Sequence, residues 1–386
     1  MAERVRTPEA WLHQAWQGRA PLLVRAGLGA AAAAYRTALA ARSASYRVGL
    51  LSTHGLPVPV VSVGNVTVGG SGKTPLAEVI ALALAELGAR PAVISRGYGR
   101  RSRGVRIVAN GGGVLLGAAE GGDEPVLLAE RLPGIPVVVG EDRHAAGAVA
   151  LGKCFANALV LDDGFQHKTL AKDLEIVAVS GSLPWGNGRL FPRGSLREPL
   201  SALKRADLVV VTNPPTPAAT SDIDHVLRRK GSRAAVLSGA YQATALRRGD
   251  RGHFERPQAL AESPGTLGGR KVLALAGLAA PGGFVATADG LGAEVVGVAE
   301  YPDHYWYTAE DLSRVAADAR EKGAEAVLTT EKDWVRIRDI PRNQWPRGDM
   351  PFWVLSVRLD LGPDRIALVQ ALADTLQRVA VGRRAP

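Results

Sequence analysis

The sequence predicts an α/β fold in which helices flank a mainly parallel sheet, with a second and smaller α/β lobe after it. Apolar, strand-like runs alternate with helical segments from residue 59 onward, the order that produces parallel sheets. A glycine-rich turn joins the first run directly to a helix, and a new series of apolar runs begins at residue 271. These observations predict two lobes with a cleft between them.

Length and composition agree with this organisation. The 386 residues exceed a typical single domain, and contents of 46% hydrophobic and 22% charged residues are typical of a globular protein. We expect an N-terminal membrane-surface helix region at 1–50 and a first domain at 51–246. A linker or surface loop at 247–270 and a C-terminal lobe at 271–386 are expected to follow.

The N-terminal region contains a basic, alanine-rich segment with helical periodicity. At about 100° per residue, Arg25, Arg36 and Arg47 fall within an arc of roughly 40°. The adjacent apolar stripe consists of Val24, Leu28, Tyr35 and Leu39. The uncharged run between the first two of these arginines has ten residues, which is too short to span a bilayer. Two interpretations stay open: an amphipathic helix on a membrane surface, or a helix packed on the protein with solvated arginines.

The net charge of +10 favours an anionic partner, which can be nucleic acid, anionic lipid or a phosphorylated substrate. Basic and aromatic residues do not interleave, and no recognition-helix or zinc-finger spacing is present, so we do not expect nucleic acid binding. The single cysteine, Cys154, cannot form an internal disulfide, which is compatible with a reducing compartment.

The expected strands have the apolar character of a sheet that helices cover. In the first domain they are Pro59–Val63, Pro91–Ser95, Ile135–Val139, Ala158–Leu161, Leu174–Val179 and Asp207–Val211, with a helix over Leu76–Leu87. In the second lobe they are Lys271–Ala276, Ala293–Val298, Ala326–Leu328 and Phe352–Val357, with a helix over Ala309–Lys322. Ligands are expected at the carboxyl ends of such strands.

The first strand leads into a segment that predicts a phosphate-binding loop. Glycines let backbone N–H groups approach anionic oxygens, and the next helix directs the positive end of its dipole at them. Lys73 supplies a mobile cation, and the Thr74 hydroxyl can ligate Mg²⁺. The generic pattern places glycine where this chain has Thr67. The segment is Thr67, Val68, Gly69, Gly70, Ser71, Gly72, Lys73 and Thr74, and it predicts a bound nucleoside triphosphate.

Two acidic pairs follow apolar or glycine-rich segments. Asp162 and Asp163 end a predicted strand, where carboxylates beside a phosphate loop can hold Mg²⁺; Asp162 is the better candidate. Asp123 and Glu124 begin a helical stretch. The residues alone leave two roles open for Asp123: a helix cap, or a base that takes a proton from an acceptor hydroxyl while Glu124 lies near the metal.

Three further groups contain charged residues near predicted strand ends. Arg96 and Arg100 belong to a basic loop that suits a phosphorylated acceptor, although solvated arginines are the competing interpretation. His304 follows a strand of the second lobe and can bias the charge of a carboxylate across the cleft. Lys332 can reach a substrate phosphate or pair with neighbouring acids.

In combination and in order, these motifs resemble the tetraacyldisaccharide 4′-kinase family, the lipid A 4′-kinases, from about residue 10 to residue 360. Thr67 also agrees with this family's form of the loop. The stretch at 191–195 is more polar and basic than the family's usual sequence. The motifs are Gly64-Asn65, Gly69–Pro75, Ser95–Gly99, Gly122–Pro125, Asp162–His167, Leu196–Pro199, Asp303-His304 and Thr329–Asp333.

The resemblance implies a kinase at the cytoplasmic face of the bacterial inner membrane, bound peripherally and not expected to oligomerise. It would use ATP and Mg²⁺ to phosphorylate the 4′-hydroxyl of an acylated glucosamine disaccharide 1-phosphate. It implies Asp123 as the base, His304 as its partner and Lys73 as a catalytic cation, with Thr74, Asp162 and Glu124 at the metal. The predicted substrate-binding residues are Arg96, Arg100, Asn65, Gln166, His167 and Arg197.

Two other function classes remain open. A P-loop kinase for a soluble metabolite would keep its activity after deletion of residues 1–45. A nucleotide-switched binding protein would show hydrolysis stimulated by its partner and would release no phosphorylated acceptor.

Overall fold

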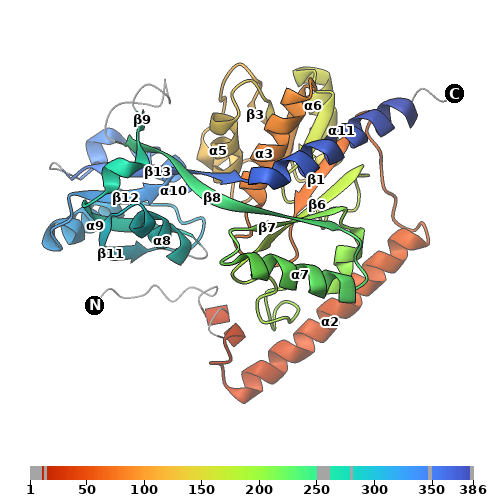
Figure 1. The fold of residues 1–386 in the computed structure, drawn as a ribbon, viewed down its shortest axis with the longest axis horizontal. Helices are drawn as coiled ribbons and strands as arrows, with labels where there is room; N and C mark the ends of the chain where they lie inside the picture. The colour runs from red at the N-terminus through yellow and green to blue at the C-terminus, as the bar shows by residue number, and fades with distance from the viewer. Residues whose placement is uncertain (1–10, 13–14, 250–260, 279–280, 347–349, 383–386) are drawn as a thin grey trace.

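The computed structural model describes residues 11–12, 15–249, 261–278, 281–346 and 350–382. Within these residues the strands form one path, in the order β11-β10-β12-β13-β8-β7-β6-β1-β5-β2-β4-β3. The two lobes lie side by side, and β8 continues from one into the other (Figure 1).

The first lobe contains the part of this path from β8 to β3, and all neighbours are parallel except the pair of β3 with β4. Its central strands are rich in valine and isoleucine and fully buried, as expected for a parallel sheet covered on both faces. The strands are β1 (Val60–Gly64), β2 (Pro91–Ser95), β3 (Arg106–Ala109), β4 (Val137–Val139), β5 (Ala158–Leu161), β6 (Leu174–Ser180), β7 (Leu208–Thr212) and β8 (Ala235–Arg248).

The second lobe contains a parallel set of four strands in the order β11-β10-β12-β13. Strand β13 runs antiparallel to β8, and the two-residue β9 (Ala261–Glu262) also pairs with β8. The four strands are β10 (Lys271–Ala276), β11 (Glu294–Glu300), β12 (Ala326–Thr330) and β13 (Phe352–Asp360).

Strand β8 joins the two lobes. Its first part, Ala235–Gly239, pairs in parallel with β7, and its later part, Ala240–Arg248, pairs antiparallel with β13. The predicted linker at 247–270 therefore needs correction at its start, because Arg247 and Arg248 are strand residues. Residues 261–262 are also strand and Pro264–Leu267 forms a short 3₁₀ helix, whereas 250–260 lie outside the described residues. Arg247 and Arg248 are strand residues because they pair with β13, which lies about 110 residues later in the chain.

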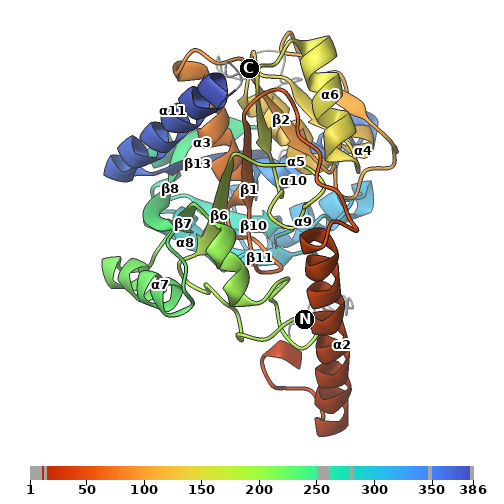
Figure 2. The same cartoon turned by 90° about the vertical axis from the view of Figure 1, so that its right-hand side faces the viewer.

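Helices cover both faces of the first lobe (Figure 1 and Figure 2). On one face, α3 (Lys73–Glu86), α5 (Asp123–Arg131) and α11 (Arg365–Gly382) pack on Val61 and Val63 of β1 and on their neighbours. On the other face, α6 (Arg143–Cys154) packs on β2, β4 and β5, and α7 (Pro217–Arg229) packs on β6 and β7. The four-residue α4 (Ala118–Gly121) precedes α5.

The second lobe has the same layered arrangement. Helices α9 (Ala309–Glu321) and α10 (Glu331–Ile337) cover one face of its sheet, and α8 (Gly282–Gly290) covers the other. Helix α9 begins at a reciprocal cap, in which the Thr308 hydroxyl accepts from the Asp311 N–H and the Asp311 carboxylate accepts from the Thr308 N–H. Its bounds match the predicted helix within one residue.

Helix α2 (Leu22–Arg47) lies along the flank of the first lobe, and its N-terminal end projects past the lobe (Figure 2). The predicted apolar stripe faces the protein: Tyr35 donates a hydrogen bond from its hydroxyl to the Arg197 carbonyl at 2.8 Å, and Leu39 is half-buried. Arg25, Arg36 and Arg47 are exposed. The apolar stripe thus packs as in the second interpretation, and these three arginines stay on the exposed surface. The described residues contain no helix with the length and apolar character needed to cross a bilayer.

A buried network of ion pairs ties the helices of the first lobe to the second. The Arg131 guanidinium, at the end of α5, contacts Glu78 of α3 at 2.9 Å and also contacts Glu331 at the start of α10. Arg358 of β13 contacts Glu78 at 2.9 Å and Glu331 at 3.0 Å. The side chains of Arg131, Glu78 and Glu331 are 6%, 4% and 8% exposed, so each charge depends on its partners.

We expect Arg131→Met to lower the free energy of unfolding by about 3–5 kcal/mol, because two carboxylates would remain buried without their main partner. Urea denaturation followed by circular dichroism measures this change. The matched control is Arg270→Met, which removes an exposed pair with Glu325 and should leave the free energy of unfolding nearly unchanged. Equal losses in the two variants would show that the network contributes no more than a surface pair.

Candidate active site

The loop between β1 and α3 has the geometry of an anion-binding site. Gly72 precedes α3 with φ +80°, and a Cβ atom there would collide with the Tyr241 hydroxyl and with Thr212. Only glycine fits such a position. No side chain among the described residues caps the first turn of α3, so its N–H groups are free to bind an anion. Gly69 also adopts a positive φ, of +113°.

A neighbouring segment holds this loop in place. The Val68 N–H donates to the Ser195 carbonyl at 2.7 Å, and Thr67 forms an antiparallel bridge with Leu196. The Asn65 amide donates to the Thr67 carbonyl at 2.7 Å, and the Gln166 amide donates to the Asn65 carbonyl at 2.8 Å. Asn65 is fully buried. The structure therefore favours shaping of the loop over direct substrate contact for Asn65 and Gln166.

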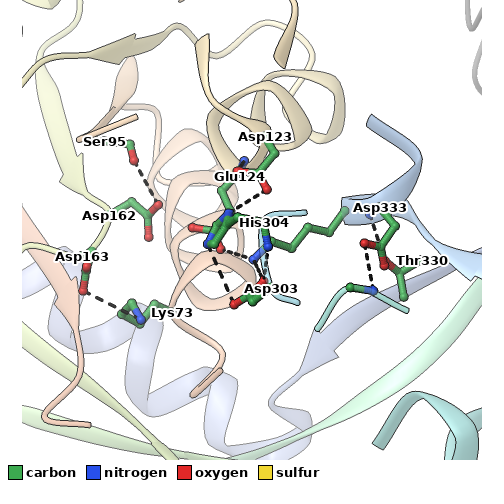
Figure 3. A network of polar contacts seen from close by, with 12 residues as sticks. Lys73, Ser95, Asp123, Glu124, Asp162, Asp163, Asp303, His304, Thr330 and Asp333 are labelled. Carbon is green, nitrogen blue, oxygen red and sulfur yellow. Dashed lines mark hydrogen bonds and ion pairs between the residues drawn. The ribbon is translucent and has the colours of Figure 1, made fainter. Parts of the chain in front are cut away.

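Asp162 follows directly after β5 and is buried beside the phosphate loop (Figure 3). Its Oδ2 accepts a hydrogen bond from the Ser95 hydroxyl at 3.3 Å, whereas its Oδ1 has no partner among the described residues. Burial, followed by the charges of Glu124 and Asp163, raises the pKa of Asp162 to about 7. A buried carboxylate oxygen without a partner is an open position for a cation.

Asp163 links the phosphate loop to the segment that follows Ser195. Its carboxylate accepts two hydrogen bonds from Arg197, at 3.0 and 2.9 Å, and lies 3.8 Å from the Lys73 ammonium. Burial alone would raise the pKa of Asp163, but Lys73 and Arg197 hold it below its ordinary value. Asp163 is therefore ionised and keeps Lys73 close to the mouth of the loop. Arg197, a predicted substrate-binding residue, is thus engaged with Asp163.

Asp123 and His304 come from different lobes and meet beside this loop (Figure 3). His304 Nδ1 lies 2.8 Å from Asp123 Oδ2, and the Asp123 side chain is 5% exposed. His304 has a φ of +59°, a conformation uncommon for a residue with a side chain and frequent at functional sites. Gly122 precedes α5, and Asp123 Oδ1 accepts from the Glu124 N–H at 2.9 Å. Asp123 is thus the first residue of the helix, and its second oxygen is directed at His304.

Electrostatics favour the charged forms of both partners. Burial alone would raise the pKa of Asp123, but the hydrogen bond with His304 and the charges of Lys332 and Arg336 lower it below the ordinary value. Burial alone would lower the pKa of His304, but the hydrogen bond with Asp123 raises it above the ordinary value. The pair therefore consists of a carboxylate and a readily protonated imidazole.

Helix α10 supports this pair with Lys332 and with Arg336, a residue that the sequence had not indicated. Arg336, with a side chain that is 1% exposed, places Nη1 3.3 Å from Asp123 Oδ2 and donates from Nη2 to Asp333 at 2.6 Å. Lys332 pairs with Glu124 at 2.8 Å and with Asp303 at 3.0 Å, which favours pairing with acids over a free phosphate ligand. Arg336 lies one helical turn after Lys332, so the two side chains share one face of α10. This spacing is the feature of the sequence that could have indicated Arg336 as a site residue.

Comparison with known proteins identifies the family. The family model described as tetraacyldisaccharide-1-P 4′-kinase matches residues 24–377. The chain belongs to this family. It is 46% identical to the tetraacyldisaccharide 4′-kinase of Anaeromyxobacter sp. strain Fw109-5, over 96% of this chain and 98% of that protein. It is 41% identical to the enzyme of the same name from Syntrophus aciditrophicus, over 80% of this chain and 82% of that one.

A solved structure agrees with this assignment. The crystal structure of LpxK from Aquifex aeolicus, in complex with ATP, superposes with a TM-score of 0.70 at 30% identity, over 92% of this chain and 99% of that chain. The expectations of a P-loop-type α/β fold, of a phosphotransferase and of membership in the tetraacyldisaccharide 4′-kinase family are thereby confirmed. The roles of individual residues stay predictions.

The residues present fit a magnesium ion held jointly with a nucleotide. The described residues contain no cluster of three or more His, Cys, Asp or Glu side chains that could hold a metal alone. Mg²⁺ bound with nucleotide needs only one or two protein oxygens, because phosphate and water oxygens complete its coordination. The unpartnered Asp162 Oδ1 is suited to this role. Thr74 at the start of α3 stays a candidate ligand, and Glu124 is held by Lys332.

The other predicted substrate-binding residues differ in availability. Arg96 is exposed after β2 and free to meet an anionic group. The Arg100 side chain is 2% exposed and donates to Glu141 at 2.7 Å and to the Gly104 carbonyl at 2.6 Å. These contacts stabilise its own loop, and the contact between Arg100 and substrate stays a prediction. His167 lies 2.7 Å from the Thr169 hydroxyl through Nε2.

We expect His167 to titrate far below the ordinary range for histidine. Burial, followed by the positive charges of Arg143 and Lys172, lowers its pKa to about 4. The folded protein then binds this proton less readily than the unfolded chain. His167 thus leaves stability unchanged above the unfolded pKa and lowers it as pH falls toward the folded pKa. At neutral pH, His167 is uncharged and adds no cation for a phosphate.

Histidine resonances followed by NMR between pH 4 and 8 measure this directly, with His167→Gln used for assignment. As the pH is lowered through the same interval, the free energy of unfolding should fall less steeply for His167→Gln than for the parent protein. A midpoint near 6.5 for His167 would contradict the expected environment.

Proposed function

We propose that this chain transfers the γ-phosphoryl group of ATP to the 4′-hydroxyl of a tetraacylated glucosamine disaccharide 1-phosphate in lipid A biosynthesis. Membership in the family and the ATP bound to the LpxK structure from Aquifex aeolicus support this substrate pair. The observation that carries the proposed mechanism is the contact between Asp123 and His304 beside the phosphate loop.

The nucleotide would bind with its phosphates in the loop at 67–74. Free N–H groups of the loop and of the first turn of α3 would bind phosphate oxygens, with Lys73 placed at the β- and γ-phosphates. Thr74 and Asp162 would hold Mg²⁺, with Glu124 near it. The bound ion supplies neutralisation of the phosphate charge. Transfer then depends on alignment and electrostatics more than on covalent chemistry by the protein.

Asp123 would accept the proton of the 4′-hydroxyl while the hydroxyl oxygen bonds to the γ-phosphorus and the bond from that phosphorus to the leaving ADP oxygen breaks. A low pKa keeps Asp123 ionised, and this weak base suffices because the hydroxyl becomes more acidic as its bond to phosphorus forms. His304 would orient the carboxylate and stabilise its charge until the proton arrives.

The acceptor is an amphiphile, so we place the kinase at the cytoplasmic face of the inner membrane as a peripheral protein. The exposed face of α2 supports this location, because the helix carries four arginines and no acidic residue. Leu22 and Leu23, at the projecting end of α2, are 78% and 86% exposed and could enter the interface. Acyl chains would then stay in lipid while the sugar reaches the loop.

The test is an assay of the full chain with labelled ATP, Mg²⁺ and a detergent-dispersed tetraacylated disaccharide 1-phosphate. We expect label on the lipid, at the 4′ position by mass spectrometry. Label that reaches only water, or only a soluble sugar phosphate, would refute the proposed acceptor. An otherwise identical disaccharide without a free 4′-hydroxyl serves as the control substrate.

A further inference from the structure

A pocket of about 730 Å³ lies between the C-terminal half of α2 and the first lobe. Its walls come from α2, from residues 168–175 and from residues 198–205. None of the residues assigned above to the nucleotide, the metal or the Asp123–His304 pair lines it. Two neighbouring residues of one segment face different sites. Arg197 contacts Asp163 at the phosphate loop, whereas Glu198 contacts Arg205 in the pocket wall.

The pocket has an excess of positive charge. Among the residues that the structure describes, no carboxylate forms an ion pair with Arg36, Arg42 or Lys168, all of which line it. Two further cations in the wall are already matched, Lys172 by Glu175 and Arg205 by Glu198. The Lys168 ammonium has a hydroxyl and an aromatic ring as neighbours, at 2.9 Å from Ser43 Oγ and 6.0 Å from the Tyr46 ring centroid. Burial, followed by the charge of Arg205, lowers the pKa of Lys168.

Part of the remaining pocket lining is apolar. Leu39 and Tyr46 of α2 face Leu170 and Ala202 of the first lobe across it. Beyond the C-terminal end of α2, Val48 and Leu50 are 69% and 78% exposed. A ligand that satisfies both parts has an anionic group for Lys168 and Arg42 and a hydrocarbon chain that continues along the apolar wall.

We propose that this pocket binds the phosphate headgroup of an anionic membrane phospholipid, with the glycerol and upper acyl chains along α2. The inference rests on the proposed membrane location and extends it to one specific contact. Charge complementarity selects an anionic headgroup over a zwitterionic one, and the apolar wall selects a lipid over free phosphate. The lipid would fix the position of α2 on the bilayer.

A soluble lipid tests the pocket without any membrane. The full chain is titrated with dihexanoyl phosphatidylglycerol below its critical micelle concentration, by calorimetry and by the rate of Lys168 acetylation measured with mass spectrometry. We expect saturable binding that protects Lys168. Lys168→Gln and Arg42→Gln should each weaken binding by about tenfold or more, the usual effect of removing a hydrogen bond to a charged group.

Arg25→Gln is the matched control, because Arg25 lies on the same helix, is exposed and does not line the pocket. It should leave the titration unchanged. Equal weakening by Arg25→Gln would show general attraction to the helix and overturn the pocket assignment. Equal protection of Lys168 by dihexanoyl phosphatidylcholine or by inorganic phosphate would overturn it as well. Circular dichroism confirms that each variant is folded.

Two further measurements separate this inference from the proposed function. Sedimentation with phosphatidylglycerol vesicles tests the membrane location. If the protein does not sediment with the vesicles but still binds the soluble lipid, the membrane location alone is refuted. In neutral detergent without anionic lipid, Lys168→Gln should leave the KM for the acylated disaccharide unchanged. A raised KM there would assign the pocket to the acceptor and refute the phospholipid.

Discussion

Replacement of Lys73 by alanine should reduce kcat by at least about 10²- to 10³-fold, the range found when one preorganised donor to a developing charge is removed. The ammonium group lies at the start of α3, 3.8 Å from Asp163, where it can move to the phosphates. Single-turnover phosphorylation of the acylated disaccharide at saturating ATP separates this effect from weaker nucleotide binding.

The fold should survive this substitution. Lys73 loses only a long ion pair with a carboxylate that Arg197 still holds, so the free energy of unfolding should change by less than about 1 kcal/mol. Lys153→Ala, in the exposed last turn of α6, is the matched control and should keep full activity. Rates near those of the parent protein in Lys73→Ala would remove the loop lysine from the mechanism.

Replacement of Asp123 by asparagine should lower kcat by roughly 10²- to 10⁴-fold, the scale of general-base assistance. Asparagine keeps the shape of the side chain and can still contact His304, but it cannot take a proton. The isosteric change is preferable to alanine because His304 and Arg336 would otherwise lose a buried partner. A loss confined to KM would make Asp123 a binding residue.

A double-mutant cycle with His304→Gln tests whether the two residues act together. If His304 acts through Asp123, the double variant should be little slower than Asp123→Asn alone, because groups that act as a unit are not additive. Independent, multiplicative losses would give His304 a separate role. The contact itself, at 2.8 Å, is what makes non-additivity the expected result.

The sequence was most informative where function depends on local backbone geometry. The loop from Thr67 to Thr74 could be predicted because glycine positions, the lysine and the start of a helix follow one another directly in the chain. Buried strands of β-branched residues were also predictable, and β2, β5 and β10 have the predicted bounds. Asp162 was identifiable because it ends one of these strands.

Strand β8 was missed because its residues alternate between buried and exposed without a continuous apolar run. This residue pattern does not indicate that the strand pairs with two different partners, with β7 in parallel and with β13 in antiparallel orientation. Likewise, the apolar stripe of α2 could be predicted, but not whether protein or membrane covers it. Burial of a given face depends on which other surface folds against it.

Local sequence by itself thus determined the phosphate loop, the parallel strands and the acidic residues at their ends. Tertiary structure decided the rest: Asp123 receives His304 and Arg336 from another lobe, and the side chains of Arg100, Asn65 and Gln166 form hydrogen bonds within the protein. The physical reason is distance along the chain. Asp123 and His304 are separated by 181 residues, and their pKa shifts arise only when the fold brings both into one buried site.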